Sequence, residues 1–141
     1  MEYSRRDLSL LPLLALAGAN AAAAETVLPS KAYRFDDLPV KTNGKNRSWA
    51  VLDGATHSGF HVDMHMTELA PGEAPHPPHH HAHEEMIMVK EGTVEVTISG
   101  KSTTIGPGST AYVASNEEHG WRNVGATPSL YFVVAFGREK A

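Results

Sequence analysis

The sequence predicts an all-β fold, either a sandwich or a barrel of short strands. Two observations lead to this prediction. No stretch after residue 24 has the apolar period of a helix, and short runs rich in Val, Ile, Thr and aromatic residues recur at intervals of about 8–12 residues between Gly, Pro and Asn. The length of 141 residues fits one domain with its own core, and 41% apolar and 20% charged residues fit a globular protein.

Composition excludes several classes of function. The chain has no Cys, which excludes disulfides, thiolate nucleophiles, zinc fingers and iron–sulfur clusters. Lys and Arg number 12 against 16 Asp and Glu, the net charge is −4, and no basic patch of the kind that binds nucleic acid is visible. Histidine is the unusual component, because five of the nine fall between His76 and His83.

Residues 1–24 are predicted to be an export signal. Arg5 and Arg6 give a positive start, and an apolar run follows that ends in small residues, with cleavage expected after Ala24 or, alternatively, after Ala21. The run is too short and too interrupted for stable membrane insertion. The pair of arginines also resembles a twin-arginine signal, which carries proteins that have already folded. We therefore expect a periplasmic or secreted protein.

The rest of the chain is divided into an N-terminal arm, residues 25–46, and a barrel domain, residues 47–141. The arm is expected to hold an edge strand around residues 33–35. The eight strands predicted in the domain are 47–53, 60–69, 85–90, 93–99, 102–105, 109–114, 119–124 and 130–136. In the second of these, Phe60, Val62 and Met64 share one face, so we expect His61 and His65 to lie on an outer or interface face. A tight turn is expected at Gly100-Lys101.

The histidine cluster has two plain interpretations, a flexible tract that binds metal loosely and a polar turn. Two features favour a built site instead. His79, His81 and Glu85 share parity, so an extended backbone would point them to one face. Glu85 also opens an apolar strand, where a carboxylate is costly unless it is paired or bound to metal. His119, which begins a later strand, is the candidate for a fourth ligand.

The residues around this cluster follow a recognisable order. A Gly and a loop precede a His-x-His pair, three residues separate that pair from a Glu, and six more lead to a second Gly. The positions are Gly72, His79, His81, Glu85 and Gly92. This order resembles the first motif of the cupin superfamily.

A second stretch resembles the other cupin motif, which is Gly, five residues, Pro-x-Gly, two residues, His, three residues and Asn. The matching positions here are Gly108, His119 and Asn123, with Ala114 and Asn116 in place of Pro and Gly. Because Asn tolerates a positive φ, the turn can survive this replacement. The resemblance extends over about residues 48–136.

The resemblance implies a double-stranded β-helix, or jelly-roll barrel, that holds one metal ion through His79, His81, Glu85 and His119. The motifs assign no role to His76, His80 or His83, although His83 shares parity with the ligands and could substitute for one or support them. Cupins are often dimers, so a homodimer is expected.

Three imidazoles and one carboxylate, without thiolate, suit a divalent transition metal, which could be Fe, Mn, Zn, Ni, Co or Cu. Fe or Mn is favoured, because a protein that folds before export takes its metal where Zn²⁺ and Cu²⁺ do not win by raw affinity. Ile87, Val113 and Trp121 share the interior with neighbouring ligands, and we expect them to line a pocket for a small organic molecule. No additional general acid or base is evident.

These features predict a metal-dependent enzyme of the dioxygenase or oxidase type that acts on an enol, a phenol or a carboxylic acid. Two alternatives remain open: a non-catalytic protein that binds metal or a small ligand, and a sugar or keto-acid isomerase. The cupin fold serves too many reactions for fold analogy to choose among them.

Overall fold

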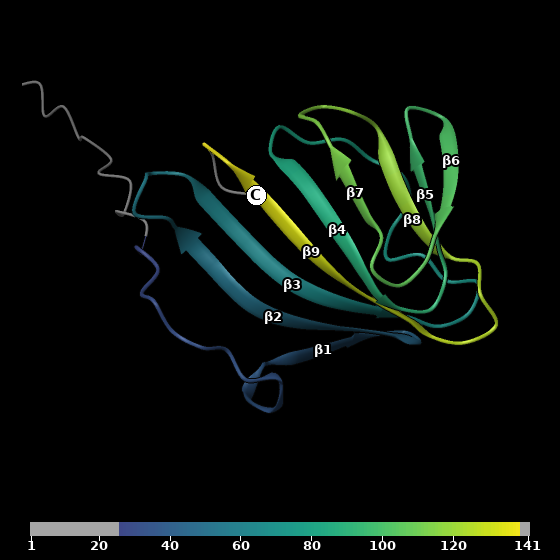
Figure 1. The fold of residues 1–141 in the computed structure, drawn as a ribbon, viewed down its shortest axis with the longest axis horizontal. Coiled ribbons are helices and arrows are strands. Elements are labelled where there is room, and N and C mark those ends of the chain that lie inside the picture. The colour runs from purple at the N-terminus through teal and green to yellow at the C-terminus, as the bar shows by residue number, and fades with distance from the viewer. Residues whose placement is uncertain (1–25, 139–141) are drawn as a thin grey trace, which may run out of the picture.

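The structure is a computed structural model that describes residues 26–138, so the predicted export signal lies outside the described residues. In this part of the chain, antiparallel strands form two sheets that pack face to face (Figure 1). The elements are the short 3-10 helix η1 (Phe35–Asp37) and the strands β1 (Val40–Asn43), β2 (Asn46–Ala55), β3 (His61–Leu69), β4 (Glu84–Glu91), β5 (Val94–Ile98), β6 (Lys101–Ile105), β7 (Thr110–Val113), β8 (His119–Asn123) and β9 (Ser129–Gly137). Within residues 26–138 no helix is long and apolar enough to cross a bilayer.

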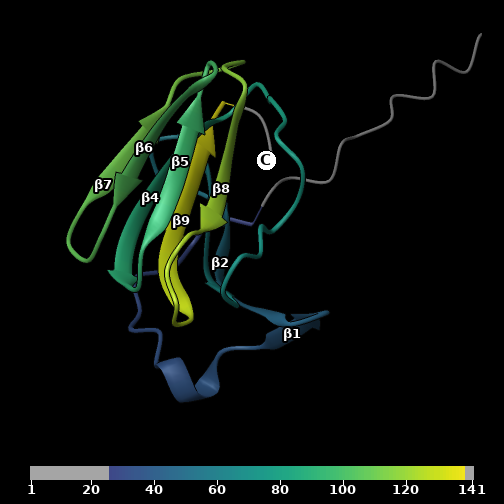
Figure 2. The same cartoon turned by 90° about the vertical axis from the view of Figure 1, so that its right-hand side faces the viewer.

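The larger sheet has six strands in the order β1-β2-β3-β9-β4-β7, and the smaller has three in the order β6-β5-β8. Figure 2 shows β5, β6 and β8 in front of the strands of the larger sheet. Every pairing between these nine strands is antiparallel. The predicted all-β fold is therefore confirmed.

The eight strands predicted for the domain are all present, each within two residues of the expected ends. The edge strand expected at residues 33–35 was wrong, because the strand that pairs with β2 is β1, at Val40–Asn43. Gly44 turns the chain between β1 and β2 with φ +60°, a conformation that glycine adopts without steric cost. Residues before β1 instead cover the sheet, and the Phe35 ring packs 5.4 Å from that of Trp49.

The turn between β5 and β6 lies one residue earlier than predicted. Ser99 and Gly100 both have positive φ, 47° and 76°, which is the backbone of a two-residue hairpin turn. A turn of this kind joins two antiparallel neighbours directly, as the β5–β6 register confirms.

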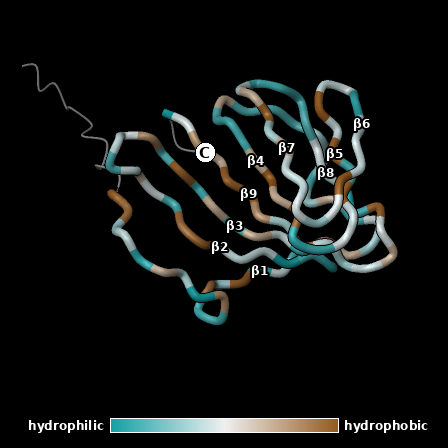
Figure 3. The backbone as a smooth tube through the Cα atoms, in the orientation of Figure 1, coloured by the Kyte–Doolittle hydropathy of each residue, from teal (hydrophilic) through white to brown (hydrophobic). Residues whose placement is uncertain are grey.

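The main core lies between the two sheets. Apolar residues recur along β3, β4 and β9 (Figure 3), and the apolar side chains that the two sheets turn toward each other are almost fully buried. They are Leu69, Ile87, Val89, Val94, Val96, Val113, Trp121, Tyr131 and Val133. The core fills one end of the sandwich, which leaves room for polar residues at the other.

The expected orientation of β3 was wrong. His61, with 2% of its surface exposed, faces inward in the same row as the core residue Leu69. Met66 lies on the outer face, where it packs with Trp49 and Leu38. The alternation along β3 was predicted correctly, but its apolar face is the outer one. Residues before β1 cover part of that outer face, and the inner face lines a polar cavity.

Candidate metal centre

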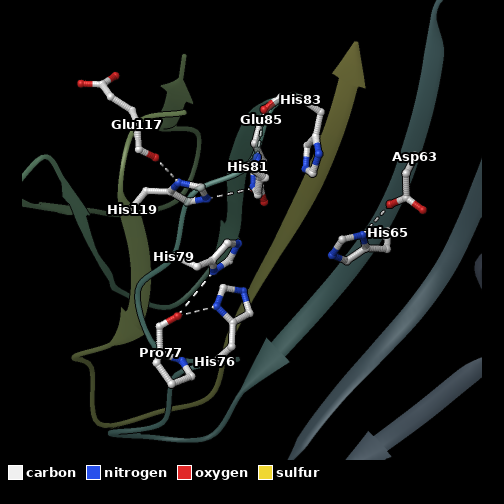
Figure 4. A network of polar contacts seen from close by, with 10 residues as sticks. All are labelled: Asp63, His65, His76, Pro77, His79, His81, His83, Glu85, Glu117 and His119. Carbon is white, nitrogen blue, oxygen red and sulfur yellow. Dashed lines mark hydrogen bonds and ion pairs between the residues drawn. The ribbon is translucent and has the colours of Figure 1, made fainter. Parts of the chain in front are cut away.

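The structure brings the four predicted ligands together at the polar end of the sandwich (Figure 4). Donor atoms of His79, His81 and His119 lie within 4.8 Å of one another. Oε2 of Glu85 lies 2.9 Å from Nε2 of His81 and 3.1 Å from Nε2 of His119. Residues from a loop, from β4 and from β8 thus line one site, in two overlapping groups that share His81.

Backbone contacts hold this loop in place. His79 and His119 exchange two backbone hydrogen bonds, of 3.0 and 2.9 Å, as an isolated antiparallel bridge. The amide of Asn116 donates to the carbonyl of His81 at 2.7 Å. Asn116 has a φ of 62°, so the turn predicted from its motif is confirmed. The positions of the ligands are therefore set by the main chain and not only by side-chain rotamers.

Each of the three histidines has its Nδ1 near a backbone carbonyl. Nδ1 of His119 is 2.8 Å from the oxygen of Glu117, and Nδ1 of His81 is 2.9 Å from that of His83. Nδ1 of His79 lies 3.4 Å from the oxygen of Pro77. Because a carbonyl accepts only, each Nδ1 must carry the proton and each neutral ring presents the lone pair of Nε2. This is the second-sphere arrangement that metal-binding histidines use.

The donor set fits a metal ion. Glu85 is buried, with 8% of its surface exposed, and its carboxylate faces the Nε2 atoms of His81 and His119. A carboxylate oxygen and the lone pair of a neutral Nε2 repel each other at this distance unless a proton or a cation lies between them. Two ligand atoms that each lie about 2.1 Å from an ion, at right angles, are about 3.0 Å apart. The observed separations therefore match adjacent ligands of one divalent ion.

Two of the other clustered histidines also line this cavity, and the third does not. His83 stacks on His81 with ring centroids 3.5 Å apart and forms a second possible metal group with His81 and Glu85. The ring of His76 lies 4.1 Å from that of His79. His80 is exposed and is not part of the cavity wall.

The pKa values of two histidines are lowered. Burial is the main cause for both His79 and His83, and the next is the positive charge of a neighbouring ring, His76 for the first and His81 for the second. A lowered pKa keeps the rings neutral near pH 7, which is the state that binds metal.

The cavity beside this group has a volume of about 420 Å³. Trp121 lines it, and its ring lies 5.2 Å from that of His119. Ile87 and Val113, which were predicted to line the pocket as well, lie in the closed core instead, with 0% and 1% of their surfaces exposed. Both side chains point inward, as their parity predicted, but they lie at the packed end of the sandwich and not beside the cavity. Tyr131, Val133 and Ala135 supply the apolar wall from β9.

Asn123, the last residue of the second motif, caps backbone groups. Its Nδ2 donates to the carbonyls of Leu69 and Thr127 at 2.9 and 2.8 Å, and its Oδ1 accepts from the amide of Gly125 at 2.9 Å. With none of its surface exposed, it connects β3, β8 and the turn before β9. Its role is structural.

Sequence analysis missed an acid–base pair. Asp63 and His65 line the cavity from β3, with Oδ1 of Asp63 2.9 Å from Nδ1 of His65. The expectation that no such group was present was wrong, because β3 was assigned the opposite orientation. The Asp-x-His spacing within a strand was the available signal, since it places both side chains on one face.

One comparison with known proteins shows the family. The family described as "Cupin domain" matches residues 65–135, which is half of the chain. A comparison with the curated proteins finds no match.

Solved structures share the two-sheet fold. A cupin described as RmlC-like from Shewanella frigidimarina has 18% identity and a TM-score of 0.63, with 78% of this chain and 95% of that one covered. The polyketide cyclase RemF from Streptomyces resistomycificus has 19% identity and a TM-score of 0.63, over 79% and 82%. A Thermotoga maritima protein described as a predicted oxalate decarboxylase has 17% identity and a TM-score of 0.62, over 74% and 97%. Identities this low show the fold alone.

Proposed function

The chain belongs to the Cupin domain family, and from that premise we propose that it is a metal-dependent enzyme acting on a small organic substrate. His79, His81, Glu85 and His119 are the proposed ligands of one divalent transition metal. The observation that carries the proposal is that three rings, each with Nδ1 at a carbonyl, have donor atoms within 4.8 Å of one another, and the Glu85 carboxylate lies against Nε2 of two of them.

The proposed reaction is of the dioxygenase or oxidase type, on an enol, a phenol or a carboxylic acid. Four nitrogen and oxygen donors suit Fe or Mn, and they leave positions on a six-coordinate ion for substrate. Such an ion would supply Lewis acidity and redox chemistry when bound. The chain contributes a cavity of about 420 Å³ whose apolar wall of Trp121 and Val133 would hold an organic molecule and exclude water.

The isomerase alternative also has an observation in its favour. Asp63 and His65 form a hydrogen-bonded acid–base pair in the same cavity, as proton transfer next to a carbonyl requires. A non-catalytic binding protein needs no such pair. The two enzyme possibilities are separated from the binding protein by turnover.

The test is to purify the mature protein from a periplasmic preparation and measure its metal content, then its O₂ uptake with a panel of phenols and keto acids. We expect one metal ion per chain, lost in the variant His79→Ala. The matched control is His80→Ala, an exposed histidine next in sequence that lies outside the cavity wall. Equal metal content in wild type and His79→Ala would overturn the assignment. One metal ion per chain without any turnover would favour the non-catalytic binding protein.

Export and self-association are further parts of the proposal. The twin-arginine-like start of residues 1–24 supports export of the folded protein, with Fe or Mn acquired first. The outer face of the larger sheet supports a homodimer, because an apolar patch there is continuous over three neighbouring strands. Its residues include Met64, Met86, Met88, Phe132 and Val134. A patch of this kind is typical of an interface, and a second copy can bury it symmetrically.

A further inference from the structure

We propose that Asp63 and His65 form a proton-transfer pair for the hydroxyl group of an enol or phenol bound in the cavity, an assignment that rests on the proposed function. The proton goes to Nε2 of His65. Asp63 positions the ring and stabilises its protonated form. Neither residue is among the proposed metal ligands.

The pair is built into β3 in a way that aims it at the cavity. Asp63 and His65 are two residues apart in a strand, so both side chains project from the inner face. Oδ1 of Asp63 lies 2.9 Å from Nδ1 of His65, where a carboxylate accepts and Nδ1 donates. The neutral ring then carries its lone pair on Nε2, the nitrogen left for substrate.

The register of the larger sheet places this pair across from the metal group. Asp63 and Glu85 both pair with Ala135, one on each side of β9. Two strand spacings separate them, which is about 10 Å between their backbones. The small side chain of Ala135 lies between, so the two carboxylates face a shared space. Figure 4 shows Asp63 and His65 on one strand, with His83 and the other clustered histidines apart from them.

That space is large enough for a substrate. Both residues line the 420 Å³ cavity together with His79, His81 and Glu85. They also line an adjoining groove of about 390 Å³ that runs over β1 and β2 and includes Lys41 and Ser48. A molecule held at the metal group can therefore place its hydroxyl next to His65 while a longer tail extends into the groove.

Among the titratable groups that face this cavity, His65 is the best placed base. Those lining the cavity and the groove are Lys41, Arg47, Asp63, His65, His76, His79, His81, His83, Glu85 and Tyr131. Burial raises the pKa of Tyr131 well above its usual range, so its phenol stays protonated. His76 packs edge-on against His79, and His83 stacks on His81, so both contact proposed ligands. His65 lies on another wall, and its side chain and that of Asp63 are 36% and 32% exposed, which lets them exchange protons with solvent.

The proposed step moves one proton from the substrate hydroxyl to His65. The O–H bond of the substrate breaks, an N–H bond forms at Nε2 of His65, and the electron pair stays on the substrate oxygen. The imidazolium that results is stabilised by the adjacent Asp63 carboxylate, as in other histidine–carboxylate pairs. Reversal of the step returns the proton to product.

The test uses the Zn²⁺-loaded protein, in which no redox chemistry occurs, with 4-nitrocatechol as the probe. The absorbance of this phenol reports its ionisation without turnover. We expect His65→Gln to raise the pH midpoint for ionisation of the bound probe by about 1–3 units and Asp63→Asn to raise it by less, with Zn²⁺ content unchanged. The control is His57→Gln, which changes an exposed histidine in the turn before β3. Thermal denaturation followed by circular dichroism establishes that each variant is folded. If His65→Gln does not fold, His65→Asn replaces it.

The results of this experiment separate the role of His65 from the substrate class and from the metal site. Equal midpoints in wild type and His65→Gln, with Zn²⁺ and probe bound, would overturn the proton-transfer role and leave the proposed function intact. Zn²⁺ bound without any probe binding would overturn the enol or phenol substrate and the role with it. Failure of the wild type to bind Zn²⁺ would overturn the proposed function itself. A raised midpoint in His65→Gln but not in His57→Gln would support the pair.

Discussion

His79 and His119 each donate a backbone N–H group to the other's carbonyl oxygen, at 3.0 and 2.9 Å, from a loop and from the first residue of β8. This bridge fixes two proposed ligands before any ion arrives. A site whose backbone is already in position loses little conformational entropy on binding, so the protein should fold without metal and bind it afterwards. Far-ultraviolet circular dichroism of the chelator-treated protein should keep its β signal, and its loss would contradict a preformed site.

Glu85→Gln should weaken metal binding by about 100-fold or more, because loss of even an outer hydrogen-bond partner of a ligand costs 10–100-fold. The amide keeps the volume of the carboxylate and removes its charge. Competition with a chromophoric chelator measures the affinity. Glu84→Gln is the control, because Glu84 bonds the exposed Tyr112 and not the histidines.

The metal-free protein should lose stability as the pH falls from 7 toward 5. The pKa values of His79 and His83 are lowered in the folded state, so the unfolded chain binds more protons below its own pKa of about 6.5. The contribution is present above that pH and is lost as the pH falls through the folded pKa. Urea denaturation at several pH values should show a smaller pH dependence in His83→Gln than in wild type, and an unchanged one in His57→Gln.

Asn123→Ala should lower the free energy of unfolding by about 2–4 kcal/mol, because it leaves the buried carbonyl of Leu69, and the part-buried carbonyl of Thr127 and amide of Gly125, without their partner. Urea denaturation of the metal-free protein measures the change. Asn43→Ala, in the exposed strand β1, should change it little. Loss of metal binding in Asn123→Ala at full stability would contradict the structural role.

Gly92→Ala should be far more destabilising than Gly100→Ala. Both glycines have positive φ, 80° and 76°, so both substitutions carry the same backbone strain of about 1–3 kcal/mol. A Cβ on Gly92 would lie 2.6 Å from the Cα of Ser129, whereas one on Gly100 would have nothing within 4 Å. Thermal denaturation of both variants isolates the steric part, and equal melting temperatures would show that the turn before β9 yields.

Met88→Glu should convert the proposed homodimer to a monomer. Met88 has 53% of its surface exposed on the outer apolar patch, where a charge would have to be buried on association. Light scattering coupled to size exclusion gives the mass. Lys90→Glu, farther along the same strand, is the control for added negative charge, and a monomeric wild type would contradict the dimer.

Local patterns predicted the strands well, and they also predicted that the four proposed ligands lie close together. The odd-numbered parity of His79, His81 and Glu85 and the place of His119 at a strand start are properties of short extended segments, which the sequence expresses directly. Which face of a strand points inward depends on what covers the other face. β3 shows this, because Trp49 and Leu38 cover Met66 from outside and leave Asp63 and His65 inside. The prediction that Ile87 and Val113 line the pocket was wrong for a related reason. Parity shows that a side chain points inward, but it does not distinguish the packed end of the sandwich from the end that holds the cavity.

The two sheets differ in width, and the six-stranded one overhangs its three-stranded partner at β1 and β2. The groove on that overhang carries Lys41 and Ser48 on strands that hold none of the proposed ligands. In the proposed enzyme, substitutions there would alter the length and charge of the molecule accepted and leave the proposed metal ligands as they are. Selectivity and reactivity would then be encoded in separate parts of one small shell, and each could diverge without the other.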